Sequence, residues 1–146
     1  MKSILMSIKP KYVSLIKSGE KILEVRKKKP IIEYPFQVYV YQTKPRGDWN
    51  EYDGHVVLEF TCDFITDSIL PAEKHLVEFS DCRDSCLTPS EIIKYAAGSM
   101  VYFWHIKDVI IYDKPRELSE FWCNKVLQHP PVSWCYVVEM MKEAEK

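Results

Sequence analysis

The chain has 146 residues, and its 20 Lys and Arg nearly balance its 21 Asp and Glu, so that the formal net charge is −1. This length suits a single domain, residues 1–146, with a substantial core. The apolar and charged fractions, 47% and 28%, are typical of a soluble globular protein. No apolar run reaches the roughly 18 residues of a membrane span, and the N-terminus does not resemble a signal peptide, so we expect a cytoplasmic protein without a membrane partner.

The charges are unevenly distributed along the chain. Residues 1–46 contain eleven Lys and Arg against three Asp and Glu, whereas the remaining residues contain nine against eighteen. If the fold keeps the first third together, the protein has one basic and one acidic face, and a basic face attracts nucleic acid through counterion release. Alternatively, the two signs are interleaved in space and the asymmetry has no consequence.

The first 19 residues predict a strand and then a helix. Residues 2–8 largely alternate apolar and polar side chains, which is typical of a strand. Pro10 suits the first turn of a helix, the apolar side chains of residues 12–16 recur at helical spacing, and Gly19 is the expected left-handed cap. The wetter side of this helix is expected to carry Lys9, Lys11 and Lys17.

Residues 22–27 predict a strand that ends in a basic run. Alternation directs Leu23 and Val25 toward a core and places Glu24 and Arg26 together on the opposite face, about 7 Å apart. Lys21 lies at the junction of loop and strand, can swing toward them, and is expected to contribute little to the core. The three charged side chains offer an anion or nucleobase site; alternatively, they protect an edge strand against aggregation.

The middle of the chain predicts two further strands, at residues 36–41 and 54–64. The loop 43–49 between them combines two cations with Trp49, which suits a phosphate and a base; alternatively, it is a solvated loop with a packed tryptophan. One face of the second strand is expected to hold Val56, Leu58, Phe60 and Cys62.

Residues 65–87 predict an irregular acidic insertion with a short helix at 72–79. Residues 88–91 form a capping box with proline at the first helical position, and the helix that they begin is expected to end at Gly98.

The last third predicts a long strand at residues 100–112, long enough to bend, then one or two helical turns at 115–121 and a closing strand at 134–139. Many strands separated by short turns favour a closed or nearly closed barrel, and the helices make the fold class α+β.

The sequence predicts neither a metal site nor a cofactor. All five cysteines are expected to be free thiols. Cys82 and Cys86, with His75 upstream, have the only metal-like spacing, and a second ligand pair is missing. Because the common nucleotide-cofactor and hydrolase motifs are also missing, the catalytic candidates are Lys21 and Glu24.

Four segments in a fixed order resemble the ASCH domain family. The family motif Gly-x-Lys-x-x-[Thr or Glu]-x-Arg is matched by Gly19, Lys21, Glu24 and Arg26. The segments similar to bacterial and phage members are Tyr102-x-Trp104-His105-Ile106, Tyr112-Asp113-Lys114-Pro115 and Pro130-Pro131-x-Ser133-Trp134-Cys135-Tyr136-Val137. This resemblance covers nearly the whole chain and implies a PUA-like fold, a mixed β-barrel flanked by short helices.

The same resemblance implies two functions. ASCH proteins are believed to bind RNA in a cleft lined by the Gly-x-Lys motif, and some small bacterial members are amidohydrolases that deacylate N4-acetylcytidine. The amidohydrolases use the motif lysine, a threonine three residues later and a glutamate elsewhere; here Lys21 matches, Glu24 replaces the threonine, and Glu59 is the candidate third residue. Because a carboxylate can act as a general base but not as a hydroxyl nucleophile, binding of RNA or a modified nucleoside is preferred and amidohydrolysis is the alternative.

The expected binding residues combine the motif with basic and aromatic side chains elsewhere: Lys9, Lys21, Glu24, Arg26, Lys44, Trp134 and Tyr136. Trp134 or Tyr136 is expected beside Lys21, where a base would stack; alternatively, both rings belong to the core. A third interpretation is a regulatory interaction protein that uses the fold as a scaffold.

Overall fold

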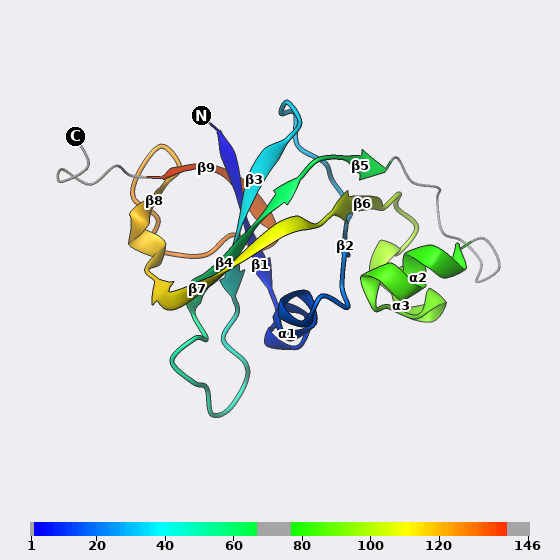
Figure 1. The fold of residues 1–146 in the computed structure, drawn as a ribbon, viewed down its shortest axis with the longest axis horizontal. Coiled ribbons are helices and arrows are strands. Elements are labelled where there is room, and N and C mark those ends of the chain that lie inside the picture. The colour runs from blue at the N-terminus through cyan, green and yellow to red at the C-terminus, as the bar shows by residue number, and fades with distance from the viewer. Residues whose placement is uncertain (1, 67–76, 140–146) are drawn as a thin grey trace.

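The computed structural model describes residues 2–66 and 77–139, which form an α+β fold (Figure 1). A six-stranded sheet has the order β7-β4-β3-β1-β9-β8, and a three-stranded sheet has the order β2-β6-β5. The strands are β1 Ser3–Ile8, β2 Leu23–Arg26, β3 Phe36–Gln42, β4 His55–Cys62, β5 Ile65–Thr66, β6 Tyr102–His105, β7 Lys107–Arg116, β8 Phe121–Trp122 and β9 Trp134–Glu139. The helices are α1 Pro10–Ser18, α2 Phe79–Ser85, α3 Pro89–Ala96 and the 3-10 turn Leu118–Glu120.

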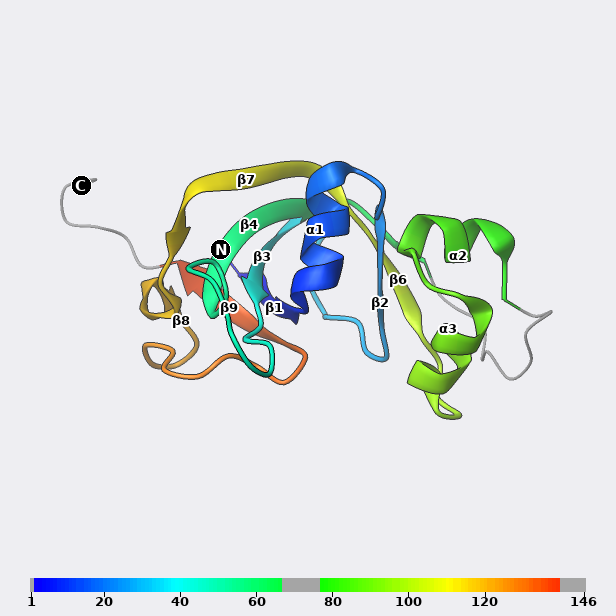
Figure 2. The same ribbon diagram turned by 90° about the horizontal axis from the view of Figure 1, so that it is seen from below.

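The two sheets are connected by strands that pass from one to the other. β4 belongs to the large sheet and β5, three residues later, to the small one; β6 and β7 are separated only by Ile106. The long strand predicted at residues 100–112 therefore exists with a bend at Ile106. Figures 1 and 2 show α1 between the large sheet and β2, and α2 and α3 at the far side of β2 and β6.

The predicted barrel does not close. Among the described strands, the large sheet ends at β7 on one side and β8 on the other, and these two do not pair. β8 has only two residues, and Pro115 in β7 has no N–H to donate. The two-residue edge β8 therefore offers too short a ladder for closure, and the α+β class is correct while the closed or nearly closed barrel is not.

Local signals in the sequence explain the two helices that surround the site. α1 begins at Pro10 and ends at Gly19, whose φ of 85° is the left-handed cap that the glycine predicted. α3 begins with a capping box in which Thr88 and Glu91 bond each other's backbone N–H groups. Its C-cap, Ala97, also has a left-handed φ, of 46°.

Three clusters of buried apolar side chains hold these elements. One fills the space between α1, β1, β3 and β4; the second lies on the other face of the large sheet, under residues 118–127; the third joins β2 and β6 to α3 through Leu23, Val25 and Ile92. The alternation predicted for β2 is therefore correct. In β4 the register shifts between Val56 and Leu58, and the Val56 side chain therefore points into the second cluster. The prediction that Val56 shares a face with Leu58, Phe60 and Cys62 is wrong for Val56.

The helix predicted at residues 72–79 falls mostly outside the described residues, and the described part of the insertion forms α2 at Phe79–Ser85. Of the one or two helical turns predicted at 115–121, the structure has one 3-10 turn, Leu118–Glu120, because β7 continues to Arg116. Within residues 2–66 and 77–139, no helix has the combined length and apolar character needed to span a membrane.

Candidate functional site

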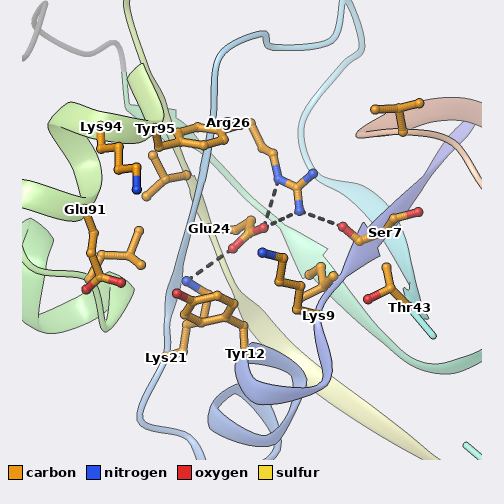
Figure 3. A pocket seen from close by; sticks show the side chains of 14 residues that line it. Ser7, Lys9, Tyr12, Lys21, Glu24, Arg26, Thr43, Glu91, Lys94 and Tyr95 are labelled. Atoms are coloured by element: carbon orange, nitrogen blue, oxygen red, sulfur yellow. Dashed lines mark hydrogen bonds and ion pairs between the residues drawn. The ribbon is translucent and has the colours of Figure 1, made fainter. Parts of the chain in front are cut away.

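A pocket of about 800 Å³ opens between α1, β2 and α3 (Figure 3). Strand β2 supplies its floor, the end of β1 and the start of α1 form one wall, and α3 forms the opposite wall. The lining residues are Ser7, Ile8, Lys9, Tyr12, Lys21, Glu24, Val25, Arg26, Thr43, Leu87, Glu91, Lys94, Tyr95 and Val132. The motif recognised in the sequence therefore lies at the floor of a cavity large enough for a nucleoside.

Glu24 occupies the centre of the floor and is bound by two cations. The Lys21 ammonium lies 3.2 Å from Oε1, while Nε and Nη2 of Arg26 donate to Oε2 at 2.9 and 2.5 Å. All three side chains are almost fully buried. The prediction that Lys21 and Glu24 reach each other with Arg26 alongside is correct, and Figure 3 shows the carboxylate between the two cations.

Arg26 also connects the pocket to β1 and to the segment before β9. Its Nη2 donates to the carbonyl oxygen of Ser7 at 2.8 Å, and its Nη1 donates to Oγ of Ser133 at 3.0 Å and to the Ser133 carbonyl at 3.3 Å. The Ser7 hydroxyl in turn donates to the carbonyl of Pro131 at 2.7 Å. The guanidinium is thus held in one orientation by groups from three parts of the chain.

Lys21 is a buried residue, which the sequence did not predict. Its Nζ donates to the carbonyl of Ser85 at 2.6 Å and lies 5.2 Å from the centre of the Tyr12 ring, in addition to the ion pair with Glu24. Only 2% of its surface is exposed. Because its ammonium is surrounded by these partners, Lys21 stabilises the floor of the pocket. The expectation that this junction lysine contributes little to the core is therefore wrong.

The surroundings keep Glu24 ionised. Burial alone would raise the pKa of its carboxyl, but the positive charges of Arg26 and Lys21 and their hydrogen bonds outweigh that effect, and the pKa lies below its ordinary value. The pKa of Tyr12 is raised, first by burial and then by the negative charges of Glu91 and Glu24. At neutral pH the floor therefore presents a carboxylate that accepts hydrogen bonds and is a weak base.

The walls add aromatic and cationic groups. The Tyr95 ring on α3 is 38% exposed, and the Tyr12 ring on α1 is half-buried. Lys9 and Lys94 are exposed and form no ion pair with another described residue. Four cations and two carboxylates line the pocket, so its net charge is about +2.

The edge-strand interpretation of the motif was half correct. β2 is an edge of the three-stranded sheet. Its charges do not face solvent, however, because α1, α3 and the end of β1 cover them. A charge defends a strand edge only where it meets water, so burial overturns this interpretation of Glu24 and Arg26.

Of the expected binding residues, Lys9, Lys21, Glu24 and Arg26 line the pocket, and the other three do not. Lys44 lies over the ring of Trp49, at 4.9 Å from its centre. Trp134 packs edge-on against Trp104 and Tyr136, at 5.6 and 5.4 Å between ring centres. Both rings are partly buried and pack against the first apolar cluster, which is nearer to the alternative interpretation than to a wall of the pocket.

Other expectations about site residues fare differently. Glu59 lies on the outer face of β4, where Gln37 and the Tyr112 hydroxyl donate to its carboxylate, and it does not line the pocket. Lys11 and Lys17 also lie outside the pocket lining and contact the rings of Tyr12 and Tyr52. His75 falls outside the described residues, within which no group of three or more His, Cys, Asp or Glu could hold a metal.

The sequence did not predict the pocket residues on α3. Glu91, Lys94 and Tyr95 lie one turn apart on α3, and only the tertiary fold brings that helix to β2. Ser133 lies outside the pocket lining but accepts a hydrogen bond from Arg26, and the sequence marks it only as part of a family-like segment. The sequence does contain a signal for α3. Glu91 and Lys94 are three residues apart and therefore share one face of the helix, away from the buried Ile92 and Ala96.

No family model and no curated protein matches the sequence. Three solved structures of an ASCH protein from Zymomonas mobilis are similar, each with 17% sequence identity. A serine-to-alanine mutant aligns with a TM-score of 0.70 over 98% of this chain and 90% of that chain, and a tyrosine-to-phenylalanine mutant does so with 0.70 over 99% and 94%. The third structure has a TM-score of 0.64 over 98% and 90%. The chain therefore has the fold of an ASCH protein, as its motifs predicted.

Proposed function

We propose that the pocket binds one nucleoside unit of an RNA strand. The observation that carries this proposal is the ionised Glu24 at the centre of the floor, held by Lys21 and Arg26 in a pocket with aromatic walls. A fixed carboxylate accepts hydrogen bonds from the amino group of a base. An apolar or aromatic wall with a few convergent polar groups is the usual composition of a small-molecule site.

The rim supplies the groups that a phosphate requires. Lys9 and Lys94 lie on opposite walls and lack a carboxylate partner among the described residues, so their ammonium groups are available to an anion. Tyr95 is 38% exposed and has the Lys27 ammonium 5.2 Å from its ring centre, and it offers an aromatic surface on which a base can stack. An RNA ligand satisfies both features at once, because each nucleotide carries a base and a phosphate.

Binding of a fluorescent single-stranded RNA, followed by anisotropy over a series of salt concentrations, tests the proposal. Affinity should fall as salt rises, and Lys9→Gln and Lys94→Gln should each reduce the slope of log K against log salt by about 0.7. Lys125→Gln, which alters an exposed lysine outside the pocket, is the matched control and should leave the slope unchanged. Salt-independent binding, or equal effects of all three variants, would overturn the proposal.

A second function is supported by the 3.2 Å contact between Lys21 and Glu24 inside the pocket. If water lay against the free side of Glu24, the carboxylate could act as the general base of an amidohydrolase on an acylated nucleoside such as N4-acetylcytidine. The lowered pKa of Glu24 disfavours this role, because a weak base removes a proton from water poorly near neutral pH. Binding is therefore preferred over hydrolysis.

Incubation with N4-acetylcytidine separates the two functions. We expect no release of acetate. Rapid hydrolysis by the wild-type protein that disappears in Glu24→Gln, with the variant still folded by circular dichroism, would reverse the order and make Glu24 the base.

A further inference from the structure

The loop between β3 and β4, residues 43–54, lies outside the pocket but begins at it. Thr43 lines the pocket, and the chain then leaves the sheet beside α1 and returns at His55 (Figure 1). The loop carries two exposed aromatic rings, Trp49 with 54% and Tyr52 with 37% of the surface accessible. Burying a large apolar side chain stabilises a protein by about 1 kcal/mol or more. Two exposed rings on one loop therefore suggest that a ligand covers them.

This loop is closed by a buried polar network. Asp53 is 3% exposed, and its carboxylate accepts from Nε2 of Gln42 at 2.7 Å and from the backbone N–H of Asn50 at 2.9 Å. The side chain of Asn50 accepts from the N–H of Tyr52 at 2.8 Å, and the N–H of Gly54 donates to the Gln42 carbonyl at 2.7 Å. These hydrogen bonds hold the backbone around the two rings in one conformation. Because the loop is already ordered, a ligand that binds the rings loses little affinity to the loop's conformational entropy.

Each ring has a lysine ammonium over one of its faces. The Lys44 ammonium lies 4.9 Å from the centre of the Trp49 ring, and the Lys17 ammonium, from α1, lies 5.2 Å from that of Tyr52. The stem of Lys44 crosses Gly54 so closely that a Cβ there would lie 2.6 Å from its Cε. The loop also carries Asp48 and Glu51, but neither forms an ion pair with these lysines in the described structure. Both ammonium groups remain available to phosphate.

We infer that the 43–54 loop is a second contact for the same RNA strand, in which Trp49 and Tyr52 stack on bases and Lys44 and Lys17 bind the adjoining phosphates. Rings interleaved with cations are the usual platform for single-stranded nucleic acid. The loop starts at Thr43 in the pocket lining, and Tyr52 contacts Lys17 of α1, the helix that contributes to one pocket wall, so one strand would reach both sites. The inference rests on the proposed function for the identity of the ligand, and it adds stacking contacts outside the pocket to the one that Tyr95 offers inside it.

The test compares a ligand that fills only the pocket with one that reaches the loop. Cytidine 5′-monophosphate, measured by calorimetry, should bind wild type and Trp49→Leu equally. A single-stranded RNA of about 8–12 nucleotides, measured by anisotropy, should bind Trp49→Leu about tenfold more weakly, whereas Trp49→Phe keeps a ring and should lose less than about threefold. Trp122→Leu, at a 42% exposed tryptophan on β8, is the matched control and should bind like wild type.

One further arm, with duplex RNA, separates the outcomes. A duplex of the same sequence should be insensitive to Trp49→Leu, because its bases are already stacked on one another. If the oligomer binds Trp49→Leu as tightly as wild type, or if the duplex loses as much affinity as the single strand, the stacking platform is wrong while pocket binding stands. If cytidine monophosphate does not bind but the oligomer still depends on Trp49, the proposed function of the pocket fails and the loop contact is upheld.

Discussion

Lys21 is buried like a structural residue, and its ammonium group lies at the floor of the binding pocket. Its ammonium group contacts Ser85, Glu24 and Tyr12, and its side chain is among the largest fully buried ones. Removing one partner of a buried ion pair leaves the other charge uncompensated, which is more costly than never having had the pair.

We therefore expect Lys21→Ala to lower the free energy of unfolding by about 3 kcal/mol. Lys21→Met also removes the charge but retains most of the buried volume, so it should lower the free energy of unfolding by less. The difference between the two variants therefore measures the cost of the cavity. Urea unfolding at neutral pH measures both. Lys9→Ala, at an exposed lysine of the same pocket, should stay within about 0.5 kcal/mol of wild type. Wild-type stability of Lys21→Ala would contradict the buried network.

Glu24 predicts a pH dependence of stability. Its pKa in the folded protein is lower than the ordinary 4.5, so the unfolded chain binds the proton more readily than the folded one. The stabilisation is therefore complete above the unfolded pKa and is lost as the pH falls from about 5 through the folded pKa, with a slope of up to about 1.4 kcal/mol per pH unit.

The pH effect is measured by urea unfolding between about pH 6 and pH 3. Glu24→Gln should flatten the profile relative to wild type, because it removes the titrating group. Glu91 also has a lowered pKa, caused first by its hydrogen bond from the Thr88 backbone, and is exposed; Glu91→Gln is therefore the control and should flatten the profile less. An equal pH profile in wild type and Glu24→Gln would show that the carboxylate is not held by the two cations.

At the scale of elements, the ends of α1 and α3 place the pocket residues. After Gly19 the backbone N–H of Lys21 donates to the Leu15 carbonyl at 3.0 Å, and this turn directs β2 under the pocket. Both helices end in a left-handed residue, but α1 uses glycine with φ 85° whereas α3 uses Ala97 with φ 46°. The left-handed conformation is costly for any residue with a Cβ.

This difference predicts opposite effects of two exchanges. Gly19→Ala should destabilise the protein by about 1 kcal/mol, and since a Cβ there would meet nothing within 4 Å, the cost is conformational alone. Ala97→Gly should stabilise it by several tenths of a kcal/mol up to about 1. Thermal unfolding of both variants gives the comparison, and a shift of the same sign in both would refute it.

At the scale of the whole molecule, an aromatic cluster joins β9 to the small sheet. Trp104 of β6 is fully buried and meets Trp134 of β9 edge-on at 5.6 Å and Phe36 of β3 at 5.8 Å. Edge-to-face contacts of this kind add to the energy of burial. The cluster therefore connects strands that the hydrogen-bond ladders leave in separate sheets.

We expect Trp134→Ala to lower the free energy of unfolding by about 2 kcal/mol, less than a fully buried tryptophan because Trp134 is half-buried. Since Trp134 does not line the pocket, the folded variant should bind a mononucleotide with nearly wild-type affinity. Denaturation and calorimetry on the same preparation check the two effects. A stable variant with strongly reduced affinity would instead support a stacking role for this ring.

The sequence by itself determined the local structure of this protein. Pro10 and Gly19 limit α1, the Thr88–Glu91 capping box begins α3, and the alternation in residues 23–26 places Glu24 and Arg26 on one face. These features depend on interactions between residues a few positions apart, so the order of residues is enough to predict them. The family resemblance added the fold, which the aligned ASCH structures confirm.

Only the tertiary structure decided which residues meet at the pocket and how deeply they are buried. The contact of Lys21 with Ser85 joins residues 64 positions apart, and that of Arg26 with Ser133 joins residues 107 apart. It likewise decided that β7 and β8 do not pair within the described residues and that Trp134 packs against the core. Such contacts follow from how sheets and helices pack against one another, and a periodic pattern within one element contains no information on the partner that covers it.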